Sequence, residues 1–178
     1  MKDGGNKMTF PIKSFFIIVL FVLLSTIGCS GGTSESGFPE GCTAESYEFK
    51  GNNLVLSEIS SKQSLYLFHN ISDKDFWLNH PLTKDPGASA GWASSLSHGK
   101  WSALTINGTT AKTENFELTC STMEQSGKTN SLDCRNVVKT CRIKNPVFNS
   151  EDSGSYWVAE NKSLTNLVSD IKNRGISW

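Results

Sequence analysis

The chain has 178 residues, of which 37% are hydrophobic and 10% aromatic, and its 17 basic and 17 acidic side chains balance. It contains no basic cluster with interleaved aromatic residues, which argues against nucleic acid as a partner. The roughly 140 residues that follow the N-terminal segments are enough for one domain with one modest core.

Residues 1–28 have the pattern of an export signal. Lys2, Lys7 and Lys13 give a positive start, and an unbroken run of ten apolar residues extends from Phe15 to Leu24. A membrane-spanning helix needs about 20 apolar residues, whereas the core of a signal peptide needs about 7–15. We therefore expect a signal peptide here and not a permanent transmembrane helix.

The signal ends at Thr26-Ile27-Gly28-Cys29, where Gly28 is the small residue that a bacterial lipoprotein signal places before its acylated cysteine. Thr26 replaces the usual leucine. We predict that Cys29 carries the lipid, because two or three acyl chains hold a membrane much better than one. Cleavage nearby, with release into the periplasm or medium, and an uncleaved anchor are the alternatives.

Residues 29–41 are predicted to be a lipid-anchored flexible tether, since they begin with a Gly/Ser-rich stretch that has no apolar side chain to bury. Ser30 stands where many inner-membrane lipoproteins carry Asp, which favours the outer membrane of the cell envelope. Removing residues 1–28 takes away three lysines and one aspartate and leaves 14 basic and 16 acidic side chains. Residues 42–178 are expected to form a single β-rich domain.

Four cysteines lie within this domain: Cys42, Cys120, Cys134 and Cys141. An even number in an exported chain predicts two disulfides. We favour Cys120–Cys134 with Cys42–Cys141, because closing a loop of ~15 residues contributes ~3 kcal/mol. The pairing of Cys120 with Cys141 and of Cys42 with Cys134 is the alternative.

From Tyr47 onward, short segments rich in aromatic and β-branched residues alternate with polar turns. This pattern favours a small antiparallel β-sandwich or barrel. Ser97-His98-Gly99 is expected to be a hairpin-like turn between two of the strands. The expected strands cover residues 53–59, 63–71, 74–80, 92–96, 100–106, 114–120, 136–143 and 155–160.

Two segments show the clearest periodicity. In residues 63–71, Leu65, Leu67 and His69 alternate with Tyr66, Phe68 and Asn70, so the two sets are expected on opposite faces of one strand. Near the C-terminus the spacing changes to that of one helix face. A helix is predicted there, capped by Ser163 or Asn161 and ended by Gly175, with its apolar face formed by Leu164, Leu167, Val168 and Ile171.

Catalytic and metal-binding patterns are weak. His69, His80 and His98 do not have the spacing of metal ligands, no G-x-S-x-G nucleophile motif is present, and the domain cysteines are assigned to disulfides. Asp73 and Asp75 fit a solvated turn better than an acid–base pair. We therefore expect a protein that is not an enzyme and that has no metal or cofactor.

Binding residues are sought among the tryptophans and in the longest loop. Five tryptophans are present, and they either form a recognition surface or fill the core. The Pro- and Gly-rich loop of residues 80–91 is the stronger candidate, since long loops on a rigid scaffold carry binding residues. The predicted binding residues are Pro86, Trp92, His98 and Trp101.

Several stretches resemble one known family: YLFHNIS, WLNHP, PGASAGWASSL, GKWSAL and GSYWVAEN. They are similar to the enhanced-entry protein EnhB family, small exported proteins of intracellular gamma-proteobacterial pathogens. The resemblance extends from about Asn53 to Ile176 and includes Cys120, Cys134 and Cys141. It implies a virulence-associated envelope or secreted protein, and it supplies no catalytic residues.

Two functions follow as expectations. The first is a non-catalytic cell-envelope lipoprotein that supports host-cell entry by contacting an envelope or host-surface protein. The second is an inhibitor or accessory of peptidoglycan-cleaving enzymes in the periplasm. In both cases the expected partners are a membrane, reached through the lipid anchor, and an unknown protein or surface.

Overall fold

The structure, a computed structural model, describes residues 37–44, 47–56, 63–80, 93–107, 116–123, 129–149 and 154–178. The predicted signal peptide, Cys29, most of the predicted tether, Pro86 and Trp92 lie outside these residues. The described elements are β1 (Cys42–Thr43), β2 (Tyr47–Lys50), β3 (Asn53–Leu56), β4 (Gln63–Asn70), β5 (Phe76–Asn79), β6 (Ala93–Leu96), β7 (Trp101–Asn107), β8 (Phe116–Met123), β9 (Thr129–Leu132), α2 (Cys134–Val137), β10 (Val138–Ile143), β11 (Val147–Phe148), β12 (Gly154–Lys162), α3 (Leu164–Asn173) and β13 (Ile176–Ser177).

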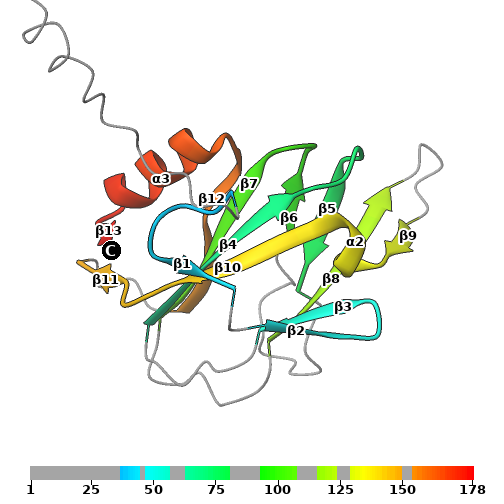
Figure 1. Cartoon of the computed structure of the whole chain (residues 1–178), viewed down its shortest axis with the longest axis horizontal. Coiled ribbons are helices and arrows are strands. Elements are labelled where there is room, and N and C mark those ends of the chain that lie inside the picture. Colours follow the sequence, from blue (N-terminus) through cyan, green and yellow to red (C-terminus); the bar gives the residue numbers. More distant parts are fainter. Residues whose placement is uncertain are drawn as a thin grey trace, which may run out of the picture. The chain divides into compact units, whose positions relative to one another are not determined.

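The strands form two main antiparallel sheets that are stacked as a sandwich. The first sheet has the order β1-β10-β4-β7-β12, and the second has the order β2-β3-β8-β5-β6 with β9 also paired to β8. Helix α3 covers the face of the first sheet that is turned away from the second (Figure 1). The predicted fold class, a small disulfide-stapled β-sandwich with one C-terminal helix, is confirmed; the barrel alternative is not, because each sheet is open.

Strand β4 lies in the middle of this three-layer arrangement and is buried on both faces. Leu65 and Leu67 point to the α3 side, while Tyr66 and Phe68 point between the sheets. The alternation predicted for this segment is therefore confirmed. Both sets are apolar because a central strand with a layer on each side has no face for solvent.

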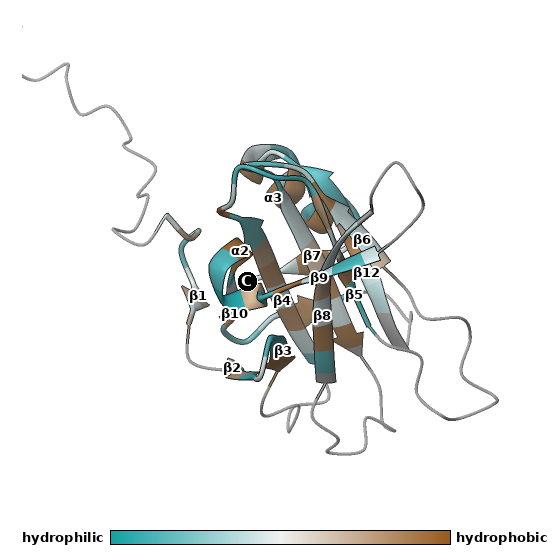
Figure 2. Ribbon diagram, turned by 90° about the vertical axis from the view of Figure 1, so that its right-hand side faces the viewer, coloured by the Kyte–Doolittle hydropathy of each residue, from teal (hydrophilic) through white to brown (hydrophobic). Residues whose placement is uncertain are grey.

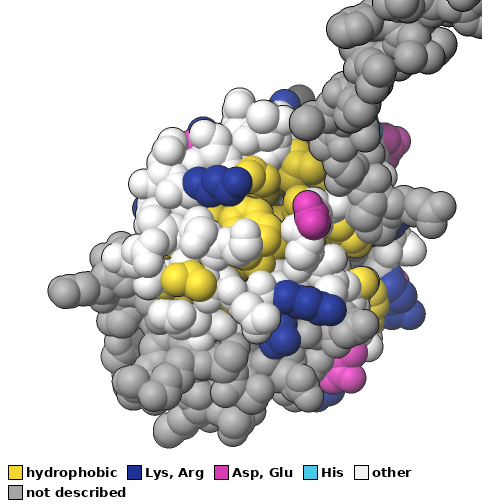
Figure 3. Space-filling model, turned by 60° about the vertical axis from the view of Figure 1, so that its left-hand side comes forward, with side chains coloured by type: hydrophobic (Ala, Val, Ile, Leu, Met, Phe, Trp, Pro, Cys, Tyr) yellow, Lys and Arg dark blue, Asp and Glu magenta, His cyan; other side chains and the backbone are white. Residues whose placement is uncertain are grey.

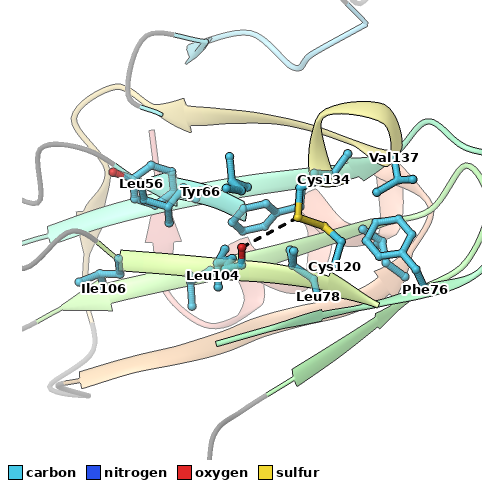
Figure 4. Close-up of a cluster of buried hydrophobic side chains, with 14 residues drawn as sticks. Leu56, Tyr66, Phe76, Leu78, Leu104, Ile106, Cys120, Cys134 and Val137 are labelled. Carbon is cyan, nitrogen blue, oxygen red and sulfur yellow. Dashed lines mark hydrogen bonds between the residues drawn. A yellow bond between two sulfur atoms is a disulfide. The ribbon is translucent and has the colours of Figure 1, made fainter. Parts of the chain in front are cut away.

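The larger core lies between the two sheets and is drawn in Figure 4. Every strand from β3 to β8, together with α2 and β10, contributes to it, and burying each large apolar side chain stabilises the fold by about 1.5–3 kcal/mol. The Cys120–Cys134 disulfide lies inside this cluster and joins β8 to the start of α2. The other side chains of this core are Leu54, Leu56, Tyr66, Phe68, Phe76, Leu78, Leu96, Leu104, Ile106, Leu118, Val137 and Val138.

The second core lies between the first sheet and α3. Ser163 caps the helix, its hydroxyl accepting a hydrogen bond from the Asn166 backbone N–H at 3.4 Å, and Leu167 and Ile171 are buried against the sheet. Gly175 follows the helix with a φ of 77°, a conformation that glycine adopts without strain. The predicted helix, its cap and its end are confirmed.

The prediction of a hairpin at Ser97-His98-Gly99 is wrong in one respect. A tight turn is present, with the Lys100 N–H bonded to the Ser97 carbonyl at 2.9 Å and Gly99 at a φ of 67°. Strand β6, however, pairs with β5 in the second sheet, whereas β7 pairs with β4 and β12 in the first. The turn therefore crosses from one sheet to the other, which local turn residues do not reveal.

Two further boundaries differ from the sequence prediction. Residues 134–137 form the short helix α2 before β10 begins, so the strand expected over residues 136–143 starts two residues late. The folded domain also begins before Cys42, because Phe38 is 7% exposed and its ring meets Trp101 edge-on at 6.0 Å. Phe38 directly follows a Gly/Ser-rich stretch, so the sequence pattern assigned it to the tether and not to the core.

Both favoured disulfides are present. Cys42 of β1 is joined to Cys141 of β10, and Cys120 of β8 is joined to Cys134 of α2. This pattern is compatible with an extracytoplasmic location, where disulfides form and persist. Neither described helix has the length and apolar character needed to cross a bilayer.

Candidate functional site

Strand β5 belongs to the second sheet, which lies on the side of the molecule that faces the viewer in Figure 2. It carries an exposed tryptophan on its outer face. Phe76 and Leu78 of this strand point inward to the core, so Trp77 and Asn79 point outward. Trp77 is 39% exposed, and it is the one exposed tryptophan among the described residues. An indole of this size standing on an outer sheet face is a natural anchor for a ligand.

Strand register places Trp77 at the centre of a row of small hydroxyl side chains. Ser95 of β6 is its partner on one side and Ser121 of β8 is its partner on the other, while Ser131 of β9 continues the row beyond Ser121. The row spans four strands, which is about 14 Å at the usual strand spacing of ~4.8 Å. Because the serines are short, the indole stands above its neighbours.

A second row lies next to the first. Asn79 is paired with Ala93 on β6 and with Thr119 on β8, and its Nδ2 donates a hydrogen bond to the Ser121 Oγ at 2.9 Å. The two rows enclose a groove of about 600 Å³, which we call the Trp77 groove. Its lining residues are Trp77, Asn79, Ala93, Thr119, Cys120, Ser121, Thr129 and Ser131.

The described lining of the Trp77 groove carries no charged side chain. Apart from the indole, it consists of hydroxyl, amide and small apolar groups. Glu117 lies further along β8, where its carboxylate accepts a hydrogen bond from Asn53. Within the described part of the chain, no hydrogen bond joins the side chain of Trp77, Ser95 or Ser131 to another described residue.

Trp101, a predicted binding residue, is instead part of the α3-side core. It is 5% exposed, and its indole stacks on the imidazole of His69 with ring centroids 4.2 Å apart and planes 5° apart. His69 and Trp101 are direct partners on β4 and β7, which explains the stacking. Trp101 therefore has no free face for a recognition surface, and the core alternative holds for it.

Burial in this stack lowers the pKa of His69 below its ordinary value of 6.5. The positive charge of Lys139, its cross-strand neighbour on β10, acts in the same direction, as does His98. A hydrogen bond with the Gly99 backbone opposes the shift. The lowered pKa favours the neutral imidazole at physiological pH.

His98, another predicted binding residue, lies in the exposed turn between β6 and β7. Its backbone N–H donates to the Asp75 carboxylate at 2.9 Å, and Ser97 Oγ donates to the same carboxylate at 3.2 Å. Asp75 thus holds the turn, which agrees with the expected turn role of this aspartate. His98 Nδ1 is bonded to the Ser72 carbonyl, so the imidazole is tied to the β4–β5 connection.

Ser97, His98 and Asp75 bring together the residue types of a hydrolase triad, but their arrangement is not that of one. In a triad the carboxylate orients the imidazole, and the imidazole accepts the serine proton. Here the serine hydroxyl donates directly to the carboxylate, and the imidazole Nδ1 is occupied by a backbone carbonyl. The cluster therefore stabilises a turn and lacks the proton path of a nucleophilic site.

The two predicted binding residues that the structure describes, His98 and Trp101, are not brought to one place. The segment that contains Pro86 and Trp92 joins β5 to β6 at the end where Asn79 pairs with Ala93. His98 follows the opposite end of β6, and the Trp101 indole lies on the far side of the first sheet. The 80–91 loop is thus the only predicted feature whose attachment points border the Trp77 groove.

A second hollow lies where the C-terminus meets residues 39–41. The indole N–H of Trp178 donates to the Glu40 carbonyl at 3.1 Å, and Lys172 lies over the ring at 5.7 Å. Figure 3 shows this side of the molecule, where hydrophobic side chains are bordered by lysines or arginines. Because the Trp178 ring already contacts Glu40 and Lys172, we interpret this hollow as a structural contact between residues 39–41 and the C-terminus and not as a ligand site.

Trp77 is the residue that sequence reasoning missed, although a signal was present. In the segment Asp75-Phe76-Trp77-Leu78-Asn79, two apolar residues alternate with a tryptophan and an asparagine. This alternation places the largest aromatic side chain on the same face as a polar amide, which a purely structural strand does not need. No three His, Cys, Asp or Glu side chains gather in the described ranges as a metal site would require.

Comparison with known proteins returned no significant match to a protein-family model, to a curated protein or to a solved structure.

Proposed function

We propose that this protein is a non-catalytic cell-envelope lipoprotein that supports host-cell entry by contacting a surface through the Trp77 groove. The observation that carries the proposal is the exposed indole of Trp77, in a groove on the outer face of the second sheet whose described lining residues are uncharged. Tryptophan is enriched among the residues that anchor binding interfaces, so an exposed indole at the centre of a sheet face supports a binding role.

The sequence supports the cellular part of this proposal. The signal at residues 1–28 and Cys29 provide export and a lipid anchor, and the resemblance to the enhanced-entry protein EnhB family provides the connection with host cells. Disulfides in the domain are in keeping with an exported protein.

The surface role is tested with full-length variants expressed in the source bacterium in place of the native gene. Trp77→Ala should reduce entry into host cells several-fold, towards the level of the gene deletion. Val147→Ala is the matched control, because Val147 is 52% exposed but lies on β11, away from the groove. Both variants should unfold within about 1 kcal/mol of the native protein, since neither change is in the core.

Entry into host cells at the native level by the Trp77→Ala strain would contradict the role of the groove.

The lipid anchor is tested separately by the intact mass of the protein purified from the bacterial envelope without reductant. The expected mass is that of residues 29–178 plus lipid, less four hydrogens for two disulfides. An unlipidated mass would replace the anchored form with a soluble periplasmic or secreted one.

A further inference from the structure

We propose that the ligand of the Trp77 groove is a neutral oligosaccharide chain on the host-cell surface. This inference rests on the proposed function for its host source. The chemical class of the ligand is argued separately, from the lining of the groove.

The lining excludes several other ligand classes. Anionic ligands need Lys, Arg or backbone nests, and none of the described lining residues is basic. Cationic ligands need carboxylates, and none of the described lining residues carries one. A lipid chain would need continuous apolar walls, whereas Trp77 and Ala93 are surrounded by hydroxyl groups.

A protein partner also fits the lining poorly. A stable protein interface buries about 800 Å² on each side and depends on several large aromatic or arginine anchors. Among the lining residues that the structure describes, Trp77 is the one large side chain of this kind. The groove is therefore too poor in anchors for a protein surface, although it suits a smaller polar ligand.

A sugar chain matches what is present. A pyranose ring has C–H groups on its faces and hydroxyl groups around its rim, so it can stack on an indole while its rim is hydrogen-bonded. Trp77 supplies the indole, and Asn79 and Ser131 of the lining supply amide and hydroxyl groups. Ser95, the cross-strand partner of Trp77 on β6, adds a hydroxyl group on the other side of the indole. The row of about 14 Å across four strands gives room for a short chain and not merely a single sugar.

Ser121 holds this arrangement in place. It is 8% exposed and accepts the hydrogen bond from Asn79 Nδ2, so the Asn79 side chain is oriented before any ligand arrives. A pre-oriented amide loses little conformational entropy on binding. Asn79→Asp is consequently informative, because it keeps the size of the side chain but replaces a donor with a negative charge.

The experiment uses the exported full-length protein, purified without reductant and applied to an array of neutral host-type glycans, bacterial cell-wall glycans and heparin. The best neutral glycan is then titrated by calorimetry. We expect saturable binding to neutral host-type glycans and none to heparin. Trp77→Ala should weaken this binding at least about tenfold, as expected for loss of an aromatic anchor, and Trp77→Phe should retain most of it.

Matched variants separate ligand recognition from folding. Val147→Ala should bind like the native protein, and Asn79→Asp should bind more weakly while unfolding at nearly the same denaturant concentration. Binding confined to cell-wall glycans would overturn the host source. Absence of binding to every neutral glycan, while Trp77→Ala still impairs host-cell entry, would overturn the ligand class and leave the proposed function standing.

Discussion

Replacing Trp101 by alanine should cause a large loss of stability, because this side chain is 5% exposed in the α3-side core. A tryptophan buries about 150–250 Å², which corresponds to roughly 4–6 kcal/mol at 25 cal/mol per Å² as an upper bound. Measured Trp→Ala changes in cores cost about 3–5 kcal/mol. The stacked His69 and the edge-on Phe38 place Trp101 in the upper half of this range.

We therefore expect Trp101→Ala to lower the free energy of unfolding by about 4–5 kcal/mol. For a domain of this size, this corresponds to a fall of roughly 12–20 °C in the melting temperature. The measurement is guanidinium unfolding of the oxidised protein at pH 7.5, followed by far-ultraviolet circular dichroism so that the loss of tryptophan fluorescence does not interfere.

Trp77→Ala is the matched control for this experiment, since it makes the same substitution at the 39% exposed tryptophan. It should cost less than about 1 kcal/mol. A loss below about 1 kcal/mol for Trp101→Ala would refute its assignment to the core. An equal loss for the two variants would refute the contrast between a buried and an exposed tryptophan, on which the choice of site depends.

Three further predictions concern the fold. Replacing both Cys42 and Cys141 by alanine opens a link across 99 residues and should cost about 4–5 kcal/mol in the chain-entropy model; an unchanged denaturation midpoint would contradict this. Because the pKa of His69 is lowered by folding, its contribution to stability is complete above the unfolded pKa of about 6.5 and is lost as the pH falls through the folded pKa. His69→Gln should flatten the unfolding free energy over this pH range, and an unaltered slope would show that another group is responsible. Gly41→Ala should cost about 1–2 kcal/mol in urea unfolding, because Gly41 has a φ of 80° and an added Cβ would lie 3.0 Å from the C-terminal indole; a neutral effect would mean that the indole moves freely.

Local patterns were sufficient for the parts of the fold in which neighbours along the chain decide the structure. The i, i+3, i+4, i+7 spacing of apolar residues, Ser163 and Gly175 defined α3, because helix hydrogen bonds and caps are local. The alternation in β4 gave the correct two faces. The pairing of Cys120 with Cys134 also followed from a short loop closure, an effect of sequence separation alone.

The tertiary structure decided which strands share a sheet and which tryptophan faces solvent. The turn at Ser97-His98-Gly99 looks the same whether it joins partners in one sheet or crosses between two, because pairing depends on strands distant in the sequence. Burial also depends on residues distant in the sequence. Trp101 and Trp77 both lie in strands that contain apolar and polar residues, so their sequence neighbours do not show which one is buried. Trp101 is buried because α3 and Phe38 cover its face of the first sheet. Trp77 points to the outer face of the second sheet and belongs to neither core of the described residues, so its indole is exposed.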